Sequence, residues 1–415
     1  MSLYTDPYSM SPLLPRQDVI GTKALLEKAS TLSRLSYRQQ CPAGVSGTLR
    51  EALRPMNSYY TNKIEGQHTS PLLIESAMRK DFSLRPDEAQ KQRAAVACML
   101  AETWAEDHVG APGELAQGGG FFQQDFICQL HHAMYRHLPI EDRTAHGTKA
   151  DGSAWIELVE PGELRSHDVQ VGQHIPPSKV ALGDFLHVFW DSYRFELKGE
   201  RAVIAILAAH HRLAWIHPFG DGNGRTVRLH THAGLHALGL TQGIWSPMRG
   251  LARNHERYYQ ALAMADKPRE GDRDGRGALS EKHLLEFIDF MLDVCLDQVE
   301  FMSKMLDVGQ LEARIHKMLM AESVSAETPN LLKLNSMLPL KYLLQTGQVA
   351  KADFKGMLGG SSDRTQSRVI KDLTTLGIIQ SDSLHAPFKL TFPIKLFRYL
   401  FPGLWVEAEN LQGLE

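Results

Sequence analysis

The chain has 415 residues, which at roughly 150 residues per domain predicts two to three domains. Its 45 Lys and Arg residues against 48 Asp and Glu residues give a net charge of −3, and 43% of its residues are hydrophobic. This composition excludes a disordered chain, a coiled coil and a uniformly basic nucleic-acid coat. Four widely separated cysteines, with no CxxC pair, exclude a disulfide framework and a zinc ribbon.

The sequence also predicts a cytoplasmic protein with no membrane segment. Residues 1–15 lack the basic segment followed by an apolar segment that marks a signal peptide. No uncharged apolar run reaches the ~18–20 residues that a membrane span needs.

The elements, taken in chain order, predict a mainly α-helical protein. Residues 1–20 are rich in Pro, Ser and Tyr and are expected to form an extended arm. Apolar residues at helical spacing predict helices from Gly21 to about His108, and a Gly-rich stretch over residues 110–120 marks a boundary. We therefore expect an N-terminal helical region over residues 1–115 and a helical core over residues 116–320.

Two short alternating runs interrupt the helical pattern of the core. Residues 155–159 and 167–171 flank the turn residues Pro161 and Gly162 and predict a β-hairpin.

A Gly-rich loop lies further along the core. Gly220, Gly222 and Gly224 cannot sit inside a helix without cost, so residues 220–224 are predicted to be a loop that opens the next helix. Backbone N–H groups and the positive end of the helix dipole make such a loop an anion site. Arg225 and Arg228 share one side of the first turn, where cations are unfavourable unless an anion lies between them.

Two further side chains beside this loop complete a set for phosphate chemistry. Asp221 is placed to hold the Mg²⁺ that accompanies a polyphosphate, and His217 to act as a general base for an incoming hydroxyl. The chain has neither a Walker A motif nor a kinase motif set. We interpret the loop as another way of holding a nucleotide, for phosphate-group transfer without a covalent enzyme intermediate.

This segment resembles the signature of the Fic family, HxFx(D/E)GNGRxxR. Every specified position matches; the matching residues are His217, Phe219, Asp221, Gly222, Asn223, Gly224, Arg225 and Arg228. The resemblance implies a Fic-type helical bundle that transfers AMP from ATP to a Ser, Thr or Tyr hydroxyl of a target protein and releases pyrophosphate. In that reaction His217 would deprotonate the hydroxyl, and Asp221 would bind Mg²⁺ that bridges the α- and β-phosphates.

The resemblance implies phosphate-binding roles for the remaining residues. The backbone of residues 222–224 and the Asn223 side chain would form the anion hole. Arg225 would stabilise the leaving β-phosphate, and Arg228 would hold the γ-phosphate. Phe219 would anchor the loop in the core.

Two segments outside the signature also resemble family features. The predicted hairpin over residues 162–172 resembles a flap that would hold an extended segment of the target protein by β-augmentation. Tyr258 and Tyr259 resemble an aromatic pair near the adenine pocket, with helix packing as the alternative. Asp266 stands where the family often has Asn.

A short string upstream, residues 61–66, predicts an inhibitory element. Thr61 and Glu65 are four residues apart and share a helix face, and Gly66 is the expected end of the helix. The string resembles the inhibitory helix (S/T)xxxE(G/N) of Fic proteins. Glu65 would pair with Arg228 in the place of the γ-phosphate and hold ATP in an unproductive pose. The same glutamate could support removal of AMP.

Three histidines at helical spacing, His230, His232 and His236, were weighed as metal ligands. Neither an HExxH motif nor a carboxylate partner accompanies them in the sequence, so packing and surface positions are the better account.

The C-terminal region over residues 329–415 predicts a winged helix-turn-helix. Residues 349–358 and a helix capped by Ser361 or Ser362 and running to Leu376 form the helix pair, and residues 377–379 and 388–392 would be wing strands. Residues 331–400 contain ten Lys and Arg against four Asp, a net charge of +6. The region would bind DNA through residues 364–371, or a protein partner or second copy in a homodimer.

Two functions from different classes follow. The first is an autoinhibited protein adenylyltransferase, with ATP as substrate and Mg²⁺ as cofactor. The second is a DNA-binding regulator in which the Fic core serves as a nucleotide sensor.

Overall fold

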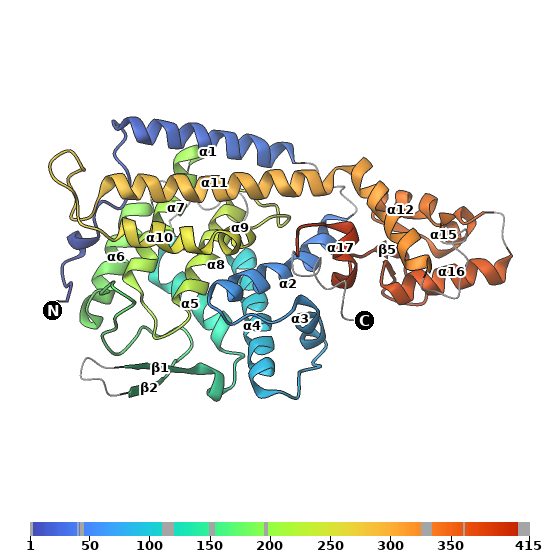
Figure 1. Ribbon diagram of the computed structural model, residues 1–415, viewed down its shortest axis with the longest axis horizontal. Coiled ribbons are helices and arrows are strands. Elements are labelled where there is room, and N and C mark those ends of the chain that lie inside the picture. Colours follow the sequence, from blue (N-terminus) through green and yellow to red (C-terminus); the bar gives the residue numbers. More distant parts are fainter. Residues whose placement is uncertain are drawn as a thin grey trace. The chain divides into compact units, whose positions relative to one another are not determined.

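The computed structural model describes residues 3–39, 41, 45–109, 120–148, 154–194, 198–324, 334–359 and 362–405. These residues are mainly helical, which confirms the predicted fold class, and they include two small antiparallel sheets (Figure 1). Among them, none of the helices combines the length and apolar character needed to cross a membrane.

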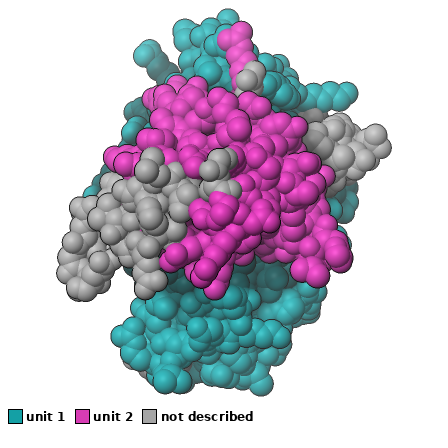
Figure 2. Space-filling view, turned by 90° about the vertical axis from the view of Figure 1, so that its right-hand side faces the viewer, with its two compact units in different colours: residues 1–37, 57–242, 246–299 teal, residues 38–56, 243–245, 300–415 magenta. Residues whose placement is uncertain are grey.

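The chain divides into two compact units, coloured separately in Figure 2. The first comprises residues 1–37, 57–242 and 246–299, and the second comprises residues 38–56, 243–245 and 300–415. The expected boundary near residue 115 does not separate units, since residues 57–242 belong to one of them. The boundary expected near residue 320 is displaced to residue 299, inside a long helix.

The helices of the first unit account for almost all of its regular structure. Their bounds are η1 Pro7–Met10, α1 Ile20–Arg38, the end of α2 Ser46–Ile64, α3 Pro71–Met78, α4 Pro86–His108, η3 Gly120–Phe122, α5 Gln124–Tyr135, η4 Ile140–Arg143, η5 Lys179–Ala181, α6 Leu182–Tyr193, α7 Gly199–Ile216, α8 Asn223–Ala237, α9 Met248–Arg253, α10 His255–Ala265 and most of α11 Glu281–Leu306.

The core of this unit is built on α7 and α8. The apolar run over residues 202–216 makes α7 buried along nearly its whole length, and α8 is buried from Asn223 to Ala237 with few exceptions. A helix that is buried all round must be covered by other helices. α4, α5 and α6 pack against this pair (Figure 1). The loop between α7 and α8 therefore starts from two rigid ends.

The predicted hairpin is wrong in its pairing. Strand β2, Ala154–Leu158, pairs antiparallel with β1, Thr144–Thr148, which precedes it in the chain. Residues 167–171 form no ladder with β2; Val171 makes a single isolated bridge to His174. Alternation indicated a strand at 155–159 correctly, but a strand pattern does not name its partner. Residues 162–172 therefore offer no hairpin edge to a target segment.

The second unit contains the elements that were predicted for residues 349–392. α15, Lys351–Met357, and α16, Asp363–Leu376, are followed by β4, Ile379–Gln380, and β5, Phe388–Leu390. A further strand, β3 at Gln348–Val349, completes a sheet in the order β3-β5-β4. The remaining elements are the start of α2, the end of α11, α12 Val308–Val324, α14 Met337–Thr346, η6 Ile394–Leu396 and α17 Phe397–Leu400.

The two ends of α16 follow from its sequence. Ser362 caps the helix because its hydroxyl accepts a hydrogen bond from the Thr365 amide, as predicted for this position. Gly377 ends the helix in the left-handed conformation, with φ of 78°. Ser361, the alternative cap, lies outside the described residues.

Candidate active site

The Gly-rich loop begins at a strained histidine. His217 ends α7 with φ of 51° and ψ of 61°, in the left-handed region. The following Pro218 disfavours continuation of the right-handed helix at this residue. Gly222, with φ of 75°, precedes α8. A Cβ on Gly222 would lie 2.6 Å from the ring of Tyr135, so only glycine fits. A loop is therefore present where one was predicted, but it ends at Gly222, and the predicted loop residues Asn223 and Gly224 already belong to α8.

Asn223 closes the loop on itself. Its Oδ1 accepts from the Phe219 amide at 2.9 Å, and its Nδ2 donates to the Phe219 carbonyl at 2.8 Å. Both ends of the side-chain amide are therefore engaged with one backbone unit. The Asn223 side chain thus holds the loop closed, and its part in an anion hole stays a prediction.

Asp221 and Arg225 meet at a shared phenol. Tyr135 donates to Asp221 Oδ2 at 2.6 Å, and Arg225 Nη2 donates both to the Tyr135 hydroxyl at 3.0 Å and to Asp221 Oδ2 at 3.2 Å. Burial opposes ionisation of Asp221, but Arg225 and Tyr135 hold the pKa of its carboxyl below the ordinary value. The carboxylate is thus charged at neutral pH, and 46% of its side chain is exposed.

One guanidinium nitrogen of Arg225, Nε, is available to bind an anion. The residue is 5% exposed, and its Nε has no hydrogen-bond partner among the described residues. A buried guanidinium nitrogen without a partner is costly, and an anion would satisfy it.

The imidazole of His217 is kept neutral. Burial lowers its pKa to about 3, and the positive charge of Arg165 and the nearby His174 act in the same direction. A neutral imidazole keeps a ring nitrogen that can accept a proton, as a general base requires, while the lowered pKa makes it a weaker base than an ordinary histidine.

A second histidine, His131, packs against the loop and binds its backbone. The His131 ring stacks on Phe219 with centroids 3.9 Å apart, and its Nδ1 accepts from the Gly162 amide at 2.9 Å. Its Nε2 therefore carries the proton and donates to the Asp221 carbonyl at 3.2 Å. Burial lowers the pKa of His131 to about 3, so this arrangement holds at neutral pH.

Arg228 is bound by the end of α2, as the resemblance implied. Its Nε donates to the Thr61 hydroxyl at 2.9 Å, and its Nη2 donates to the Thr61 carbonyl at 3.1 Å and to Glu65 Oε1 at 2.5 Å. Arg228 is 1% exposed. A Cβ on Gly224 would lie 2.3 Å from Glu65 Oε1, so glycine at this position lets the carboxylate approach the start of α8.

The comparisons with known proteins agree with this geometry. Residues 121–235 match the model of the Fic/DOC family. The chain contains a Fic domain. Beyond the signature, this domain includes α5, which supplies His131 and Tyr135, and the hairpin β1–β2.

Relatives of known name match the Fic domain alone. "Protein adenylyltransferase Fic" of Drosophila willistoni is 34% identical over 118 residues, which cover 28% of this chain and 22% of that protein. The protein of the same name from Culex quinquefasciatus is 34% identical over 122 residues, with the same coverage. The chain thus spans about a fifth of the length of these relatives.

One solved structure resembles nearly the whole chain. The crystal structure of a Fic family protein from Desulfovibrio desulfuricans G20 covers 92% of this chain and 98% of its own, with a TM-score of 0.51 and 17% identity. At this identity the likeness concerns the fold alone.

The predicted aromatic pair lies in the first unit, beyond the residues that match the family model, and its two members occupy different environments. Tyr258 is 2% exposed and its hydroxyl lies 2.7 Å from His210 Nε2, so it is part of the core. Tyr259 is 44% exposed and donates to the Ile64 carbonyl at 3.1 Å, one residue before Glu65. Of the two rings, Tyr259 alone presents a large exposed surface.

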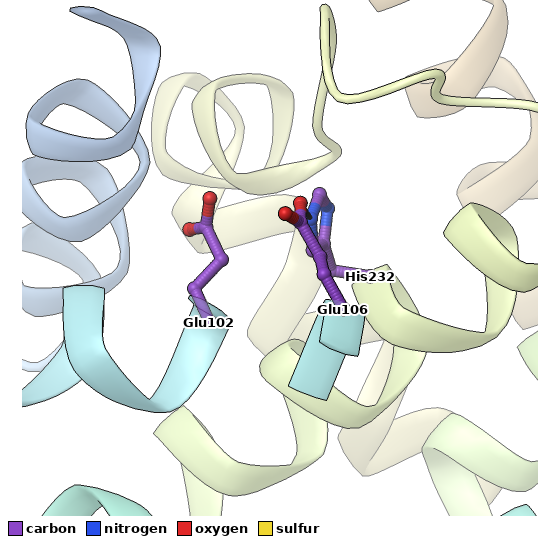
Figure 3. A group of neighbouring side chains, drawn as sticks. All are labelled: Glu102, Glu106 and His232. Carbon is purple, nitrogen blue, oxygen red and sulfur yellow. Dashed lines mark hydrogen bonds and ion pairs between the residues drawn. The ribbon is translucent and has the colours of Figure 1, made fainter. Parts of the chain in front are cut away.

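The three α8 histidines find partners that the sequence did not indicate. His232 Nε2 lies 2.9 Å from Glu106 Oε1, and Glu102 is the third member of this buried group (Figure 3). His236 Nδ1 lies 3.9 Å from the same Glu106 oxygen. His230 stacks on Phe121 and bonds its carbonyl. Carboxylate partners from α4 thus exist, contrary to what the local sequence suggested.

Sequence reasoning missed three residues of the site. Tyr135 and His131 lie on α5, and Arg165 lies in the segment after β2. Their positions in the chain are distant from the signature, and none belongs to a motif. The helical spacing of four between His131 and Tyr135 places both on one face of α5, which is the signal that was available.

Proposed function

We propose that this protein transfers AMP from ATP to a hydroxyl group of a target protein. The observation that carries the proposal is a short loop that has a neutral imidazole, His217, at its start and leads into a helix whose first turns carry two buried arginines, Arg225 and Arg228. The names of the relatives support the same reaction for the Fic domain. Identity of the target is left to experiment.

The proposed reaction assigns one step to each side chain. His217 accepts the proton of the target hydroxyl while the oxygen forms a bond to the α-phosphorus of ATP. The bond from that phosphorus to the oxygen that bridges the α- and β-phosphates breaks, and pyrophosphate leaves. Arg225 balances the charge that develops on the leaving group, and its unpartnered Nε is the donor for it.

The residues present fit a magnesium ion. Asp221 is charged and its side chain is 46% exposed, and a single carboxylate together with phosphate oxygens is the usual way in which Mg²⁺ is held. Tyr135 and Arg225 both contact Oδ2, so the carboxylate is fixed in orientation. When bound, Mg²⁺ would neutralise phosphate charge. Asp221 would hold it there.

The same proposal includes a built-in inhibitory contact. Glu65 and the Thr61 carbonyl both accept from Nη2 of Arg228, the residue assigned to the γ-phosphate, and the Thr61 hydroxyl accepts from Nε. A phosphate needs the same donors. The wild-type chain is therefore expected to transfer AMP slowly, until Glu65 moves away.

Intact-mass analysis after incubation with ATP and Mg²⁺ tests the proposal. In cell lysate or on the protein itself, Glu65→Gly should add the mass of AMP to a protein, wild type should add much less, and Glu65→Gly combined with His217→Ala should add none. Equal labelling by wild type and Glu65→Gly would contradict the proposal that the contact between Glu65 and Arg228 inhibits transfer. If no sample contains an adduct, the proposed transfer of AMP is contradicted.

A second candidate function is carried by α16. This helix exposes Arg364, Arg368 and Lys371 while Val369 and Leu373 are buried, and it belongs to the region of net charge +6. A basic exposed helix as the second member of a helix pair is typical of major-groove binding. We propose DNA as its ligand, with a protein partner or a second copy of the chain as the competing outcome.

The full-length protein in a mobility-shift assay distinguishes these outcomes. Arg364→Glu with Lys371→Glu should abolish retardation of duplex DNA, whereas Arg79→Glu with Arg85→Glu, an equal charge change on exposed residues of the first unit, should preserve it. If wild type does not retard DNA, or both double variants bind equally, DNA binding by α16 is excluded.

A further inference from the structure

Arg165 is a buried cation in the segment that follows β2. The residue is 5% exposed, and its guanidinium is fully enclosed. Its nearest carboxylate is that of Asp168, at 3.7 Å from Nη1. Burial lowers the pKa of Arg165 to about 10, which leaves it charged at neutral pH. A charge held this way costs stability unless its donors are satisfied.

The donors of Arg165 are satisfied by main-chain carbonyls around the His217 turn. Nε donates to the His217 carbonyl at 2.9 Å, Nη1 to the His167 carbonyl at 2.8 Å, and Nη2 to the Pro177 carbonyl. The Arg165 amide donates to the Pro218 carbonyl at 2.9 Å. Arg165 thus binds the carbonyls of two successive residues of the catalytic loop and two further carbonyls in the segment that follows β2.

The turn that Arg165 holds is strained. His217 is one of the few non-glycine residues with positive φ among those described, at 51°. A non-glycine residue in the left-handed region is disfavoured and persists only where its surroundings fix it. Within the Gly-rich loop, the Asn223 side chain holds Phe219 and does not reach His217. The contacts of Arg165 act directly on the peptide unit after His217.

We propose that Arg165 is a positioning residue, which fixes the carbonyls of His217 and Pro218 and thereby aims the His217 imidazole at the reacting hydroxyl. The proposal rests on the function proposed above, in which His217 is the base. Arg165 makes no contact with the reacting atoms in this account. Its effect passes entirely through the backbone of the turn.

Two variants separate geometry from charge. Arg165→Gln removes the cation and the fork of donors. Arg165→Lys keeps the cation but cannot serve three carbonyls in the same geometry. In the Glu65→Gly background, both should lower kcat for AMP transfer by at least about tenfold, with the KM for ATP changed by less than about threefold, because misplacing a base affects the chemical step. Arg79→Gln, at an exposed residue directly after α3, is the matched control and should retain the parent kcat.

A spectroscopic measurement tests positioning without activity. The ¹³Cα and ¹³Cβ shifts of His217 report its φ and ψ, and its signal is identified by loss in His217→Ala. With ¹³C-labelled histidine, the left-handed shift pattern should be present in wild type and in Arg79→Gln, and should be lost or averaged in Arg165→Lys and Arg165→Gln.

The outcomes are distinguishable. An unchanged His217 shift pattern in both Arg165 variants overturns the proposal, whatever happens to kcat. If Arg165→Gln does not fold, Arg165→Lys decides alone. If no sample transfers AMP, the proposed function fails, while the shifts still decide whether Arg165 fixes the turn.

Discussion

At the scale of single residues, the Fic domain uses one phenol to connect two opposite charges. The Tyr135 hydroxyl donates to Asp221 and accepts from Arg225, so it fixes the carboxylate and the guanidinium relative to each other. Neither group would need to reorganise when a phosphate arrives.

Tyr135→Phe should therefore impair the reaction more than the fold. In the Glu65→Gly background we expect kcat to fall by about tenfold, and the free energy of unfolding to fall by about 1 kcal/mol for the lost hydrogen bonds. The control is Tyr193→Phe, which removes the hydrogen bond from another buried tyrosine to the Leu13 carbonyl. AMP incorporation and urea denaturation measure both effects. Equal losses of activity in the two variants would contradict the assignment.

Buried histidines make the stability of the first unit depend on pH. Burial lowers the pKa of His131 and His217 to about 3 and that of His230 to about 4. Below pH 6.5 the unfolded chain protonates these imidazoles while the folded chain does not. The unfolded state then binds more protons, so stability is full above pH 6.5 and is lost as pH falls toward 4.

His230→Gln should flatten this dependence. Each such histidine lowers the free energy of unfolding by about 1.4 kcal/mol per pH unit in that window, and glutamine can still donate to the Phe121 carbonyl. Urea denaturation at pH 6.5, 5.5 and 4.5 gives the slope for each protein. Parallel lines for wild type and variant would show that His230 is not part of the effect.

At the scale of elements, the end of α2 is held to α8 through one arginine. Thr61 supplies two of the three acceptors of Arg228, and Glu65 supplies the third. The threonine contacts come from Thr61 itself and do not involve the Glu65 side chain. They therefore define how far α2 must move before the guanidinium is available to a phosphate.

Thr61→Val should release the inhibitory contact in part. Valine has the same shape but leaves the buried Arg228 Nε without its acceptor, so we expect AMP transfer between that of wild type and that of Glu65→Gly. The free energy of unfolding should fall by about 1–3 kcal/mol. Thr103→Val, which removes a hydroxyl bonded to its own helix in α4, is the control. Activity at or below the wild-type level would place the restraint in Glu65 alone.

Elements whose signals are local were predictable, and their partners were not. Gly222 and Gly377 interrupt helices through their own backbone conformations, so both the loop before α8 and the end of α16 could be predicted. The strand at residues 154–158 was visible in its alternation. Its partner at residues 144–148, Thr-Ala-His-Gly-Thr, has no alternating apolar pattern, which is why the hairpin was assigned to the wrong side.

The residues of the candidate site also divide into those with a local sequence signal and those placed by tertiary packing. The signature placed His217, Asp221, Arg225 and Arg228 together, since one loop and one helical turn carry them all. Tyr135 and Arg165 reach that loop only through tertiary packing, and the sequence around them, including the spacing of four between His131 and Tyr135, does not name the loop as their partner. Asn223 shows a further limit, because its type was predicted to matter while the choice between anion and backbone required coordinates.

At the scale of the whole molecule, the N-terminal arm belongs to the unit that contains the Fic domain. The Pro12 carbonyl accepts from both Nε and Nη2 of Arg212, at 3.0 and 2.8 Å, and Arg212 is fully buried in α7. The Tyr4 ring lies 5.1 Å from that of Trp215, two residues before His217. The expected extended arm thus contributes to the core.

Removal of residues 1–12 should lower the thermal midpoint by several degrees. The buried Arg212 loses its acceptor, at a cost of about 1–3 kcal/mol, and each kcal/mol corresponds to about 2–4 °C for a unit of this size. In an Arg212→Met background the same truncation should cost less, because the two changes share one interaction. Differential scanning calorimetry of the four proteins completes the cycle. Additive shifts would show that the arm stabilises α7 by other contacts.

The ion pair between Glu65 and Arg228 has a consequence for how such a protein would respond to its supply of nucleotide. If the open arrangement is disfavoured by about 1.4 kcal/mol, the concentration of ATP that half-saturates the productive pose rises about tenfold, and twice that energy raises it about a hundredfold. The strength of one contact would then set a threshold. The rate of AMP transfer would then depend on the concentration of ATP around this threshold. A partner that displaces α2 would change the threshold without contacting the catalytic loop.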